Sequence, residues 1–284
     1  VLCQVLKEQA KASNFCHDSI LENIARLRSK KVFTVTTGHQ VCLFGGPLFF
    51  FYKILSVIKL AEQLKEQNID TVPVYWMASE DHDFQEINSF NFQDKKIQWK
   101  RNSAGAVGDF PLNDLQEALD IFETNLGNNP EVSFIKELLE KSYRKAENLS
   151  EATFKLVDQL FGSYGLIVLE PNQKVLKSLF SPIIKDELTN ASSFKSVSDQ
   201  INLIKTNYNK KYTPQVNPRE INLFYLSPPG RHLIKKSKNG FSLIGSELNF
   251  TKDTFFKILK KYPERFSPNV ILRPLYQEII LPNL

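Results

Sequence analysis

The sequence predicts an α/β fold in which helices flank a parallel sheet, and three segments carry this prediction. A short β-type segment over residues 33–36 is followed by a glycine-containing turn, an amphipathic helix and an apolar strand over 72–77. Two parallel strands joined by one helix form a right-handed βαβ unit almost without exception. The nearly all-apolar segment 164–169 is typical of a buried parallel strand and indicates a third strand of the same sheet.

Helices are expected before and inside this βαβ unit. Residues 1–30 place apolar side chains at helical spacing, with candidate breaks at Asn14 and Asp18. The helix between the first two strands is predicted from Leu48 to about Gln67, and Pro47 suits the first turn of a helix.

The pattern changes after the second strand, where shorter elements are expected. In order, these are a β-ribbon over 87–101, mostly helical chain over 112–163, a helix after 172 that reaches about Thr189, a β-rich stretch over 213–250 with a hairpin turn at 238–240, a short helix over 253–261, and a last core strand over 270–272.

This order predicts a core that is interrupted by two insertions. The five expected segments are 1–110 as the first part of the core with its N-terminal helices, 111–163 as a mainly helical insertion, 164–205 as the return to the core sheet, 206–252 as a β-rich insertion, and 253–284 as the last core segment.

Composition excludes several classes of protein. With 42% hydrophobic and 24% charged residues, the chain is ordinary for a globular protein. The net charge of +5 is spread over mixed helical faces, so no nucleic-acid stripe is expected. The longest apolar run, 41–52, contains two glycines and a proline, and it is too short to span a membrane.

Three cysteines, Cys3, Cys16 and Cys42, occur without a CxxC pair. This sparse, odd number argues against a disulfide scaffold and favours a reducing cytoplasm. No signal peptide is visible. Because the chain lacks an initiator Met and a polar tail, we expect it to be a fragment of a longer protein.

The glycine-containing turn after the first strand is a candidate phosphate site. Glycines let backbone N–H groups approach a ligand, and the following helix offers the positive end of its dipole to an anion. The alternative is a tight βα connection with a capping histidine, because the turn matches neither a Walker loop nor a dinucleotide fingerprint. The residues assigned to nucleotide binding are Gly38, His39, Gln40, Gly45, Gly46, Pro47 and Lys53; for Lys53 alone, a solvated surface lysine is the alternative.

The densest polar cluster is Glu80, Asp81, His82 and Asp83, directly after the second strand. We predict that these residues are catalytic and lie close to His39, because the ends of parallel strands meet at one edge of the sheet. Alternation along an extended chain would put Glu80 and His82 on one side and the two aspartates on the other. The alternatives are N-capping of the next segment or a satisfied internal network, and the spacing does not favour zinc.

Two further polar groups occur in the second half of the chain. Residues 235–238 are similar to the lysine-serine-lysine loop of class I aminoacyl-tRNA synthetases, but solvated charge at a hairpin turn is the better interpretation. Arg219, Glu220 and Asn222 form either an edge ion pair or part of a pocket. We expect substrate-binding residues in this half, and the candidates are Arg219, Asn222, Arg231 and Arg273.

Taken together, these segments resemble the BshC family, the enzymes assigned to the cysteine-adding step of bacillithiol biosynthesis. The resemblance spans most of the chain and is strongest in the long block that contains the acidic cluster. The matching stretches are 37–40, 46–53, 72–84, 86–88, 164–169, 215–216, 219–220, 222–226, 267–270, 273–274 and Gln277.

The resemblance implies a Rossmann-like core with inserted connecting-peptide segments. It implies a ligase that adds cysteine to the amino group of glucosaminyl malate, with ATP, by analogy with synthetases, as the activating cosubstrate and Mg²⁺ as a candidate cofactor. Family members continue into a C-terminal coiled coil that mediates homodimerisation and that this chain lacks. The position of His39 is often glutamine in the family, which favours a hydrogen-bonding role. The other classes left open are a metal-assisted hydrolase or transferase acting on a small sugar and a non-catalytic thiol-sugar binding protein.

Overall fold

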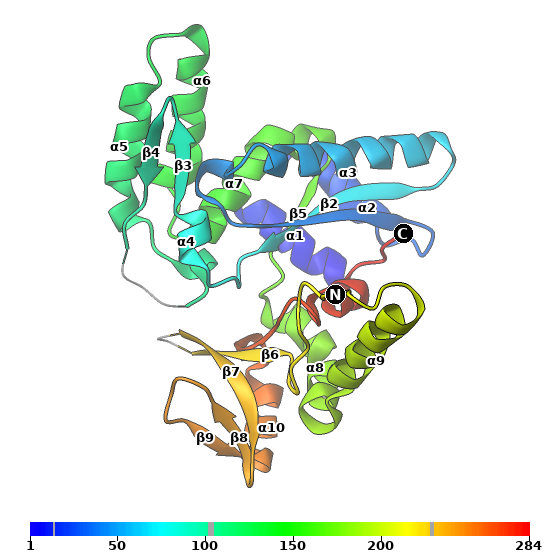
Figure 1. Ribbon diagram of the computed structural model, residues 1–284. Helices are drawn as coiled ribbons and strands as arrows, with labels where there is room; N and C mark the ends of the chain where they lie inside the picture. The colour runs from blue at the N-terminus through cyan, green and yellow to red at the C-terminus, as the bar shows by residue number, and fades with distance from the viewer. Residues whose placement is uncertain (14, 102–104, 228–229) are drawn as a thin grey trace. The chain divides into compact units, whose positions relative to one another are not determined.

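A three-stranded parallel sheet forms the centre of the N-terminal part of the protein, in the order β1 (Phe33–Gln40), β2 (Thr71–Ala78) and β5 (Ile167–Leu169) (Figure 1). The computed structural model describes residues 1–13, 15–101, 105–227 and 230–284. These residues form two compact units, Val1–Pro171 with Leu281–Leu284 (unit 1) and Asn172–Ile280 (unit 2). Asn14, one of the two predicted breaks, lies outside the described residues.

Helices cover both faces of this sheet, as the sequence predicts. Helix α3 (Phe49–Glu66) packs on β1 and β2, while α1 (Leu2–Ala12) and α2 (Asp18–Arg26) contact β5. Figure 1 shows α3 above the sheet and α1 below it. All eight residues of β2 are buried, which explains why this strand is so apolar. The buried face of α3 consists of side chains at helical spacing, namely Phe50, Ile54, Val57, Ile58 and Ala61.

Between β2 and β5, unit 1 contains the predicted β-ribbon and helices. Trp99, which follows the ribbon, is fully buried, and its indole N–H donates to Asp114 Oδ1 over 2.7 Å. The elements are α4 (Phe84–Ile87), β3 (Ser89–Phe92), β4 (Lys95–Gln98), η2 (Val107–Asp109), η3 (Asn113–Leu115), α5 (Gln116–Asn125), α6 (Pro130–Leu139), the π-helical turn η4 (Glu140–Arg144), α7 (Leu149–Phe161) and η5 (Gly162–Tyr164).

The predicted last core strand at 270–272 is wrong. These residues form a turn before helix α11 (Arg273–Ile280). The chain segment that extends the parallel sheet lies further on, where Asn283 forms a parallel bridge with Thr34. The Asn283 side-chain oxygen accepts hydrogen bonds from the hydroxyls of Thr34 and Thr36, both over 2.8 Å. A three-residue apolar run therefore did not distinguish a strand from a turn, and the true contact depends on a polar side chain.

Unit 2 is built on a five-stranded antiparallel sheet in the order β10-β6-β7-β8-β9. Its core contains Tyr225, Phe241, Phe255 and Phe266, and the ring of Phe255 contacts the other three rings. The hairpin turn at 238–240 is confirmed, because Ser237 pairs with Gly240. The elements are α8 (Lys174–Asn190), α9 (Ser192–Asn207), β6 (Leu223–Ser227), β7 (Gly230–Ser237), β8 (Gly240–Leu243), β9 (Asn249–Thr251), α10 (Lys252–Lys261), η6 (Pro263–Arg265), β10 (Phe266–Pro268) and α11.

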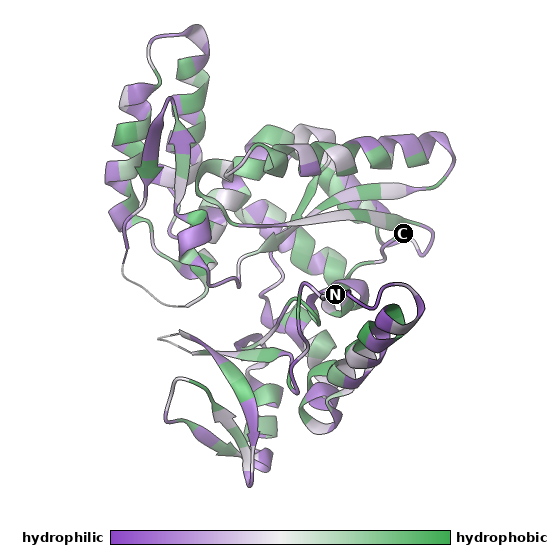
Figure 2. Cartoon of the chain, viewed as in Figure 1, coloured by the Kyte–Doolittle hydropathy of each residue, from purple (hydrophilic) through white to green (hydrophobic). Residues whose placement is uncertain are grey.

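Helix α9 differs from the other long helices because none of its residues is buried. Figure 2 shows hydrophilic colour over much of this helix. Among the described residues, no helix combines the length and the apolar character needed to cross a membrane. The division of the chain into five functional segments stays a prediction.

Candidate functional site

The ends of the three parallel strands bring polar side chains together at one edge of the sheet. Gln40, the last residue of β1, pairs with Ala78, the last residue of β2, and Leu169 at the end of β5 pairs with Trp76. The residues that follow, Ser79 to Asp81 and Glu170, therefore share this edge with Gln40. The Gln40 side-chain amide donates to Asp81 Oδ2 over 3.0 Å. The predicted meeting of the end of the first strand and the acidic cluster is confirmed, but the contact is made by Gln40, the residue after His39.

Gln40 holds two carboxylates at once. Its Nε2 also donates to Glu86 Oε2 over 2.8 Å. The backbone N–H of His82 donates to the other Asp81 oxygen over 2.7 Å, and His82 Nδ1 lies 3.4 Å from that oxygen. Because a neutral amide supplies two N–H donors without adding charge, the site remains acidic while the Asp81 carboxylate is fixed in one orientation.

The predicted alternation of residues 80–83 is wrong, because the chain turns after β2 instead of continuing extended. Glu80 is buried, whereas more than half of the His82 side chain is exposed, so these two residues do not share a face. Asp83 is exposed and caps helix α4, since its Oδ1 accepts the N–H of Glu86 over 3.3 Å. The capping alternative therefore describes the geometry of Asp83.

A loop that the sequence did not mark as functional closes over the acidic cluster. The N–H of Val107 donates to the Asp81 carbonyl over 2.7 Å, and the N–H of Gly108 donates to the Ser79 carbonyl over 3.0 Å. These bonds place Asp109 close to Glu80. Burial and then the negative charge of Glu80 raise the pKa of Asp109, although the residue as a whole is exposed.

Gly108 explains why this loop can lie so close to β2. A Cβ atom at this position would lie 2.2 Å from Ser150 Oγ, 2.7 Å from Ser79 Cβ and 2.9 Å from the Ser79 carbonyl oxygen. Only glycine fits there. The sequence signal available for this contact was the glycine itself, but nothing local identifies its distant partners.

Glu170 is a second residue that sequence analysis missed as a site residue. It directly follows β5, and its Oε1 accepts a hydrogen bond from the Ser79 hydroxyl over 2.6 Å. Its backbone is held by the Gln9 side chain, which donates to the Glu170 carbonyl and accepts its N–H. The rule that located the 80–83 cluster, a polar residue at the end of a parallel strand, applies equally to Glu170.

The first turn differs from its prediction in two respects. Strand β1 continues to Gln40, so Gly38, His39 and Gln40 belong to the strand and not to the turn. The turn itself folds tightly, with positive φ at Phe44, Gly45 and Gly46. Four of its backbone N–H groups already have acceptors. Those of Cys42, Gly45 and Gly46 donate to carbonyls of residues 40–43, and that of Phe44 donates to the Tyr143 hydroxyl.

Lys53 faces the same region from the second turn of α3. Its ammonium group donates to the Gly38 carbonyl, and partial burial lowers the pKa of Lys53. His39 is packed against the rings of Phe49 and Phe50. Burial lowers the pKa of His39, the hydrogen bond with the Gln40 carbonyl partly opposes this shift, and the charge of Lys53 adds to it, so the neutral imidazole is favoured. Nucleotide binding by these residues stays a prediction.

Cys42 should react slowly with alkylating agents. Its thiol is buried beside His39 Nδ1 at 3.8 Å, and burial together with the charges of Glu86 and Asp81 raises its pKa to about 11. Since the thiolate is the reactive form, only about 0.1% of Cys42 is reactive at pH 8, roughly a hundredfold less than an ordinary thiol. Mass-spectrometric alkylation kinetics should show Cys3 reacting first, and the Cys42 rate should rise about tenfold per pH unit. A Cys42 rate equal to that of Cys3 at pH 8 would contradict the assigned environment.

The four predicted substrate-binding residues lie in unit 2, and the structure gives one of them a structural role. Asn222 is fully buried; its amide donates to Glu187, Ser193 and the Arg219 carbonyl, and its oxygen accepts the Arg219 N–H. Arg231 packs over the Phe224 ring at 3.8 Å.

The other two arginines, Arg219 and Arg273, differ in exposure. Arg219 is exposed and lines a hollow of about 240 Å³ with Glu220 and Leu233, while Arg273 is half-buried at the start of α11. In the lysine-rich turn, Lys236 pairs with Glu220 over 3.3 Å. Substrate binding by the four predicted residues stays a prediction.

No group of three or more His, Cys, Asp or Glu side chains is arranged to hold a metal ion within the described parts of the chain. In the acidic cluster, hydrogen bonds from Gln40 join the carboxylates of Asp81 and Glu86. Such a network can hold an ammonium group or accept a proton from one.

Comparison with known proteins identifies the family. A family model described as "Bacillithiol biosynthesis BshC, N-terminal Rossmann-like domain" matches residues 1–284. The chain is 46% identical over 269 residues to a protein of Flavobacterium johnsoniae named "Putative cysteine ligase BshC", covering 94% of this chain and 50% of that protein. A protein of the same name from Flavobacterium psychrophilum is 44% identical, with 100% of this chain and 53% of the relative covered.

More distant relatives show the same relation. A protein from Staphylococcus saprophyticus, also named "Putative cysteine ligase BshC", is 30% identical over 91% of this chain. The chain spans about half the length of the curated relatives it matches. The parallel sheet flanked by helices is the Rossmann-like domain that the family model describes. Because that model matches the whole chain, and relatives that cover almost all of it exceed 40% identity, this protein belongs to the BshC family.

Proposed function

We propose that this chain is the Rossmann-like part of a ligase that joins cysteine to the amino group of glucosaminyl malate, giving bacillithiol. Family membership and the names of the relatives support the cysteine-ligase assignment. The observation that carries the proposal is the carboxylate network at the carboxyl edge of the sheet, where Gln40 fixes Asp81 beside the loop that bears Asp109. Open α/β sheets bind ligands at this edge.

The carboxylates suit the chemistry of amide formation. The sugar amine is an ammonium ion near pH 7, and it must lose a proton before it can attack an acyl group. Asp81, held in one orientation, is proposed to bind the ammonium group. Asp109, whose pKa is raised by burial and by Glu80, is better matched than an ordinary carboxylate to accept the proton. His82 and Glu80 are proposed to complete the pocket around the amine.

Joining a carboxylate to an amine in water also requires an activated acyl group, and ATP is proposed as the source of activation by analogy with synthetases. The N–H groups of Cys42, Phe44, Gly45 and Gly46 already have acceptors, so these groups do not form a ready phosphate cradle. Two features do fit an anion, namely the ammonium group of Lys53 and the N-terminus of α3 after Pro47. We therefore propose that Lys53 and this helix end hold the nucleotide phosphates. Mg²⁺ is proposed to enter only as the partner of the nucleotide.

The test uses the full-length protein, because the chain covers about half of its relatives. The protein is incubated with cysteine, glucosaminyl malate, ATP and Mg²⁺, with a control that omits ATP, and bacillithiol is measured by mass spectrometry. Product only in the presence of ATP is the expected result. Product formed without ATP would contradict the proposed activation of the acyl group by ATP. Hydrolysis of the sugar substrate would instead support a hydrolase. Ligand binding without turnover would support a non-catalytic thiol-sugar binding protein.

The relatives' remaining half is proposed to supply the coiled coil through which the full-length protein forms a homodimer. Light scattering of the full-length protein and of residues 1–284 tests this part of the proposal. A dimer is expected for the first sample and a monomer for the second.

A further inference from the structure

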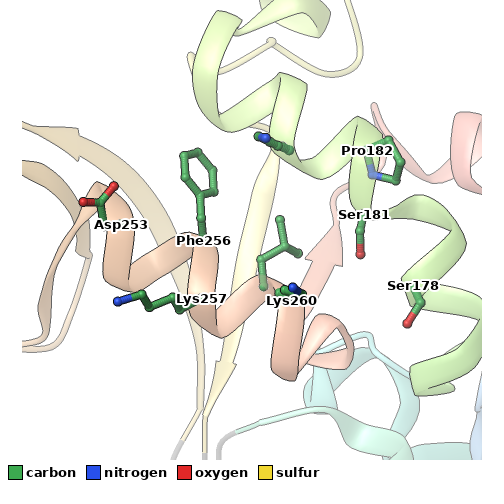
Figure 3. Close-up of a pocket in the computed structure, with 9 residues that line it drawn as sticks. Ser178, Ser181, Pro182, Asp253, Phe256, Lys257 and Lys260 are labelled. Atoms are coloured by element: carbon green, nitrogen blue, oxygen red, sulfur yellow. The ribbon is translucent and has the colours of Figure 1, made fainter.

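A basic hollow lies in unit 2 between helices α8 and α10, and its lining residues are different from those of the candidate site. It has a volume of about 860 Å³ and is lined from α8 by Ser178, Ser181, Pro182 and Lys185, and from α10 by Asp253, Phe256, Lys257, Leu259 and Lys260. Figure 3 shows labelled residues from both helices around this hollow. A volume of this size is within the range of small-molecule sites.

The charges of the hollow are unbalanced. Three lysines face a single carboxylate, Asp253, and no ion pair joins Lys185, Lys257 or Lys260 to an acidic side chain within the described residues. By contrast, Lys59, Lys141, Lys155 and Lys236 each have a carboxylate partner. Three like charges around one concave surface repel each other, and a bound anion would relieve that repulsion.

The acidic residues of α8 do not compensate these lysines. Asp186 accepts a hydrogen bond from Asn190, and Glu187 is buried, where it binds Ser193 and Asn222. These two carboxylates therefore do not neutralise the lysines, and the hollow keeps its net positive charge.

Besides the charged groups, the lining of the hollow provides an apolar surface and hydroxyl groups. Lys185 Nζ lies 5.9 Å from the centre of the Phe256 ring, which leaves the ammonium group at the edge of an apolar floor formed with Leu259. Pro182 lies inside α8 and has no N–H, so the Ser178 carbonyl lacks its usual helical donor. The hydroxyls of Ser178 and Ser181 lie on the same side and donate to carbonyls of the preceding turn, which leaves their oxygens as acceptors for a ligand hydroxyl.

We propose that this hollow binds a phosphorylated small molecule, with the phosphate among Lys185, Lys257 and Lys260 and an apolar or planar part on Phe256. Lysine ammonium groups bind phosphate as point charges, and a phosphate group carries more negative charge than a single carboxylate, so it is the better match for the three ammonium groups of the hollow. This inference does not depend on the ligase proposal, because its residues belong to unit 2 alone.

The test measures binding of inorganic pyrophosphate to the 284-residue chain by calorimetry, at two salt concentrations. Saturable binding that weakens with salt is expected, and succinate at the same concentrations should bind at least tenfold more weakly. If succinate bound as tightly as pyrophosphate, the hollow would not be selective for phosphate, and the proposed ligand class would be wrong. No saturable binding of pyrophosphate would overturn the proposal.

Variants separate a built site from diffuse charge. The double variant Lys257→Gln/Lys260→Gln should weaken pyrophosphate binding by about tenfold or more. The matched control is Lys235→Gln/Lys238→Gln, which removes the same charge from the β7–β8 hairpin of the same unit, and its affinity should stay within about twofold. Asp253→Asn removes the one carboxylate and should tighten binding several-fold. If both double variants weakened pyrophosphate binding equally, or if Asp253→Asn left the affinity unchanged, the binding would be due to non-specific surface charge and the proposal would be wrong.

Discussion

Replacing Asp81 by Asn in the full-length protein should lower the rate of bacillithiol formation by about 10²-fold or more, because the variant lacks the carboxylate that is proposed to bind and position the ammonium group of the substrate. Asn retains an oxygen that can accept the His82 N–H, so the fold should lose only about 1 kcal/mol of its free energy of unfolding. The rate is measured at saturating cysteine, glucosaminyl malate and ATP, and thermal unfolding is measured on the same sample. A variant rate within threefold of the wild type would remove Asp81 from the mechanism.

Asp83→Asn is the matched control for this experiment. It makes the same chemical change two residues away, and Asn caps helices about as well as Asp, so helix α4 keeps its cap. Because the Asp83 side chain is exposed and engaged in capping, we expect activity to fall less than tenfold. A loss as large as that of Asp81→Asn would instead show that the negative charge of Asp83 takes part in the reaction.

Replacing Gly108 by Ala should disrupt the candidate site indirectly, by displacing the loop that carries Asp109. The added Cβ would overlap backbone and side-chain atoms of Ser79 and the Ser150 hydroxyl, so the loop would have to move away from β2. That movement breaks the hydrogen bonds from Val107 and Gly108 and separates Asp109 from Glu80. We expect a loss of about 2 kcal/mol in the free energy of unfolding and at least a tenfold loss of activity.

Gly127→Ala controls for the general effect of adding a methyl group to a glycine. Gly127 has positive φ, but a Cβ there would meet no atom within 4 Å. Backbone strain should therefore cost about 1 kcal/mol without a loss of activity. If Gly108→Ala retained full activity despite its lower stability, the contact between the loop and the strand end would be structural only.

The positions of the three parallel strands β1, β2 and β5 could be predicted because the signals are local. Apolar runs, a proline at the start of a helix and the handedness of a βαβ unit together brought Gln40 and Asp81 to the same edge of the sheet. Glu170 directly follows the third strand, so the rule that polar residues at the carboxyl ends of parallel strands share one edge also predicts its position.

The contacts that complete the site could not be predicted because they join residues far apart in the chain. Gly108 on Ser79 and Asn283 on Thr34 depend on sequence separations of tens to hundreds of residues, and a single glycine or asparagine does not specify its partner. The capping role of Asp83 depends on the turn after β2, since an extended chain would have pointed the same side chain elsewhere.

The most direct test of the central claim is hydrogen exchange of the full-length protein with and without glucosaminyl malate and cysteine, read by mass spectrometry. If the carboxyl edge of the parallel sheet is the reaction site, ligands should slow exchange in peptides that cover 38–47, 79–86 and 105–110. Asp81→Asn should reduce this protection, whereas Asp83→Asn should keep it. Protection confined to other peptides, with these three unchanged, would place the site elsewhere and contradict the assignment.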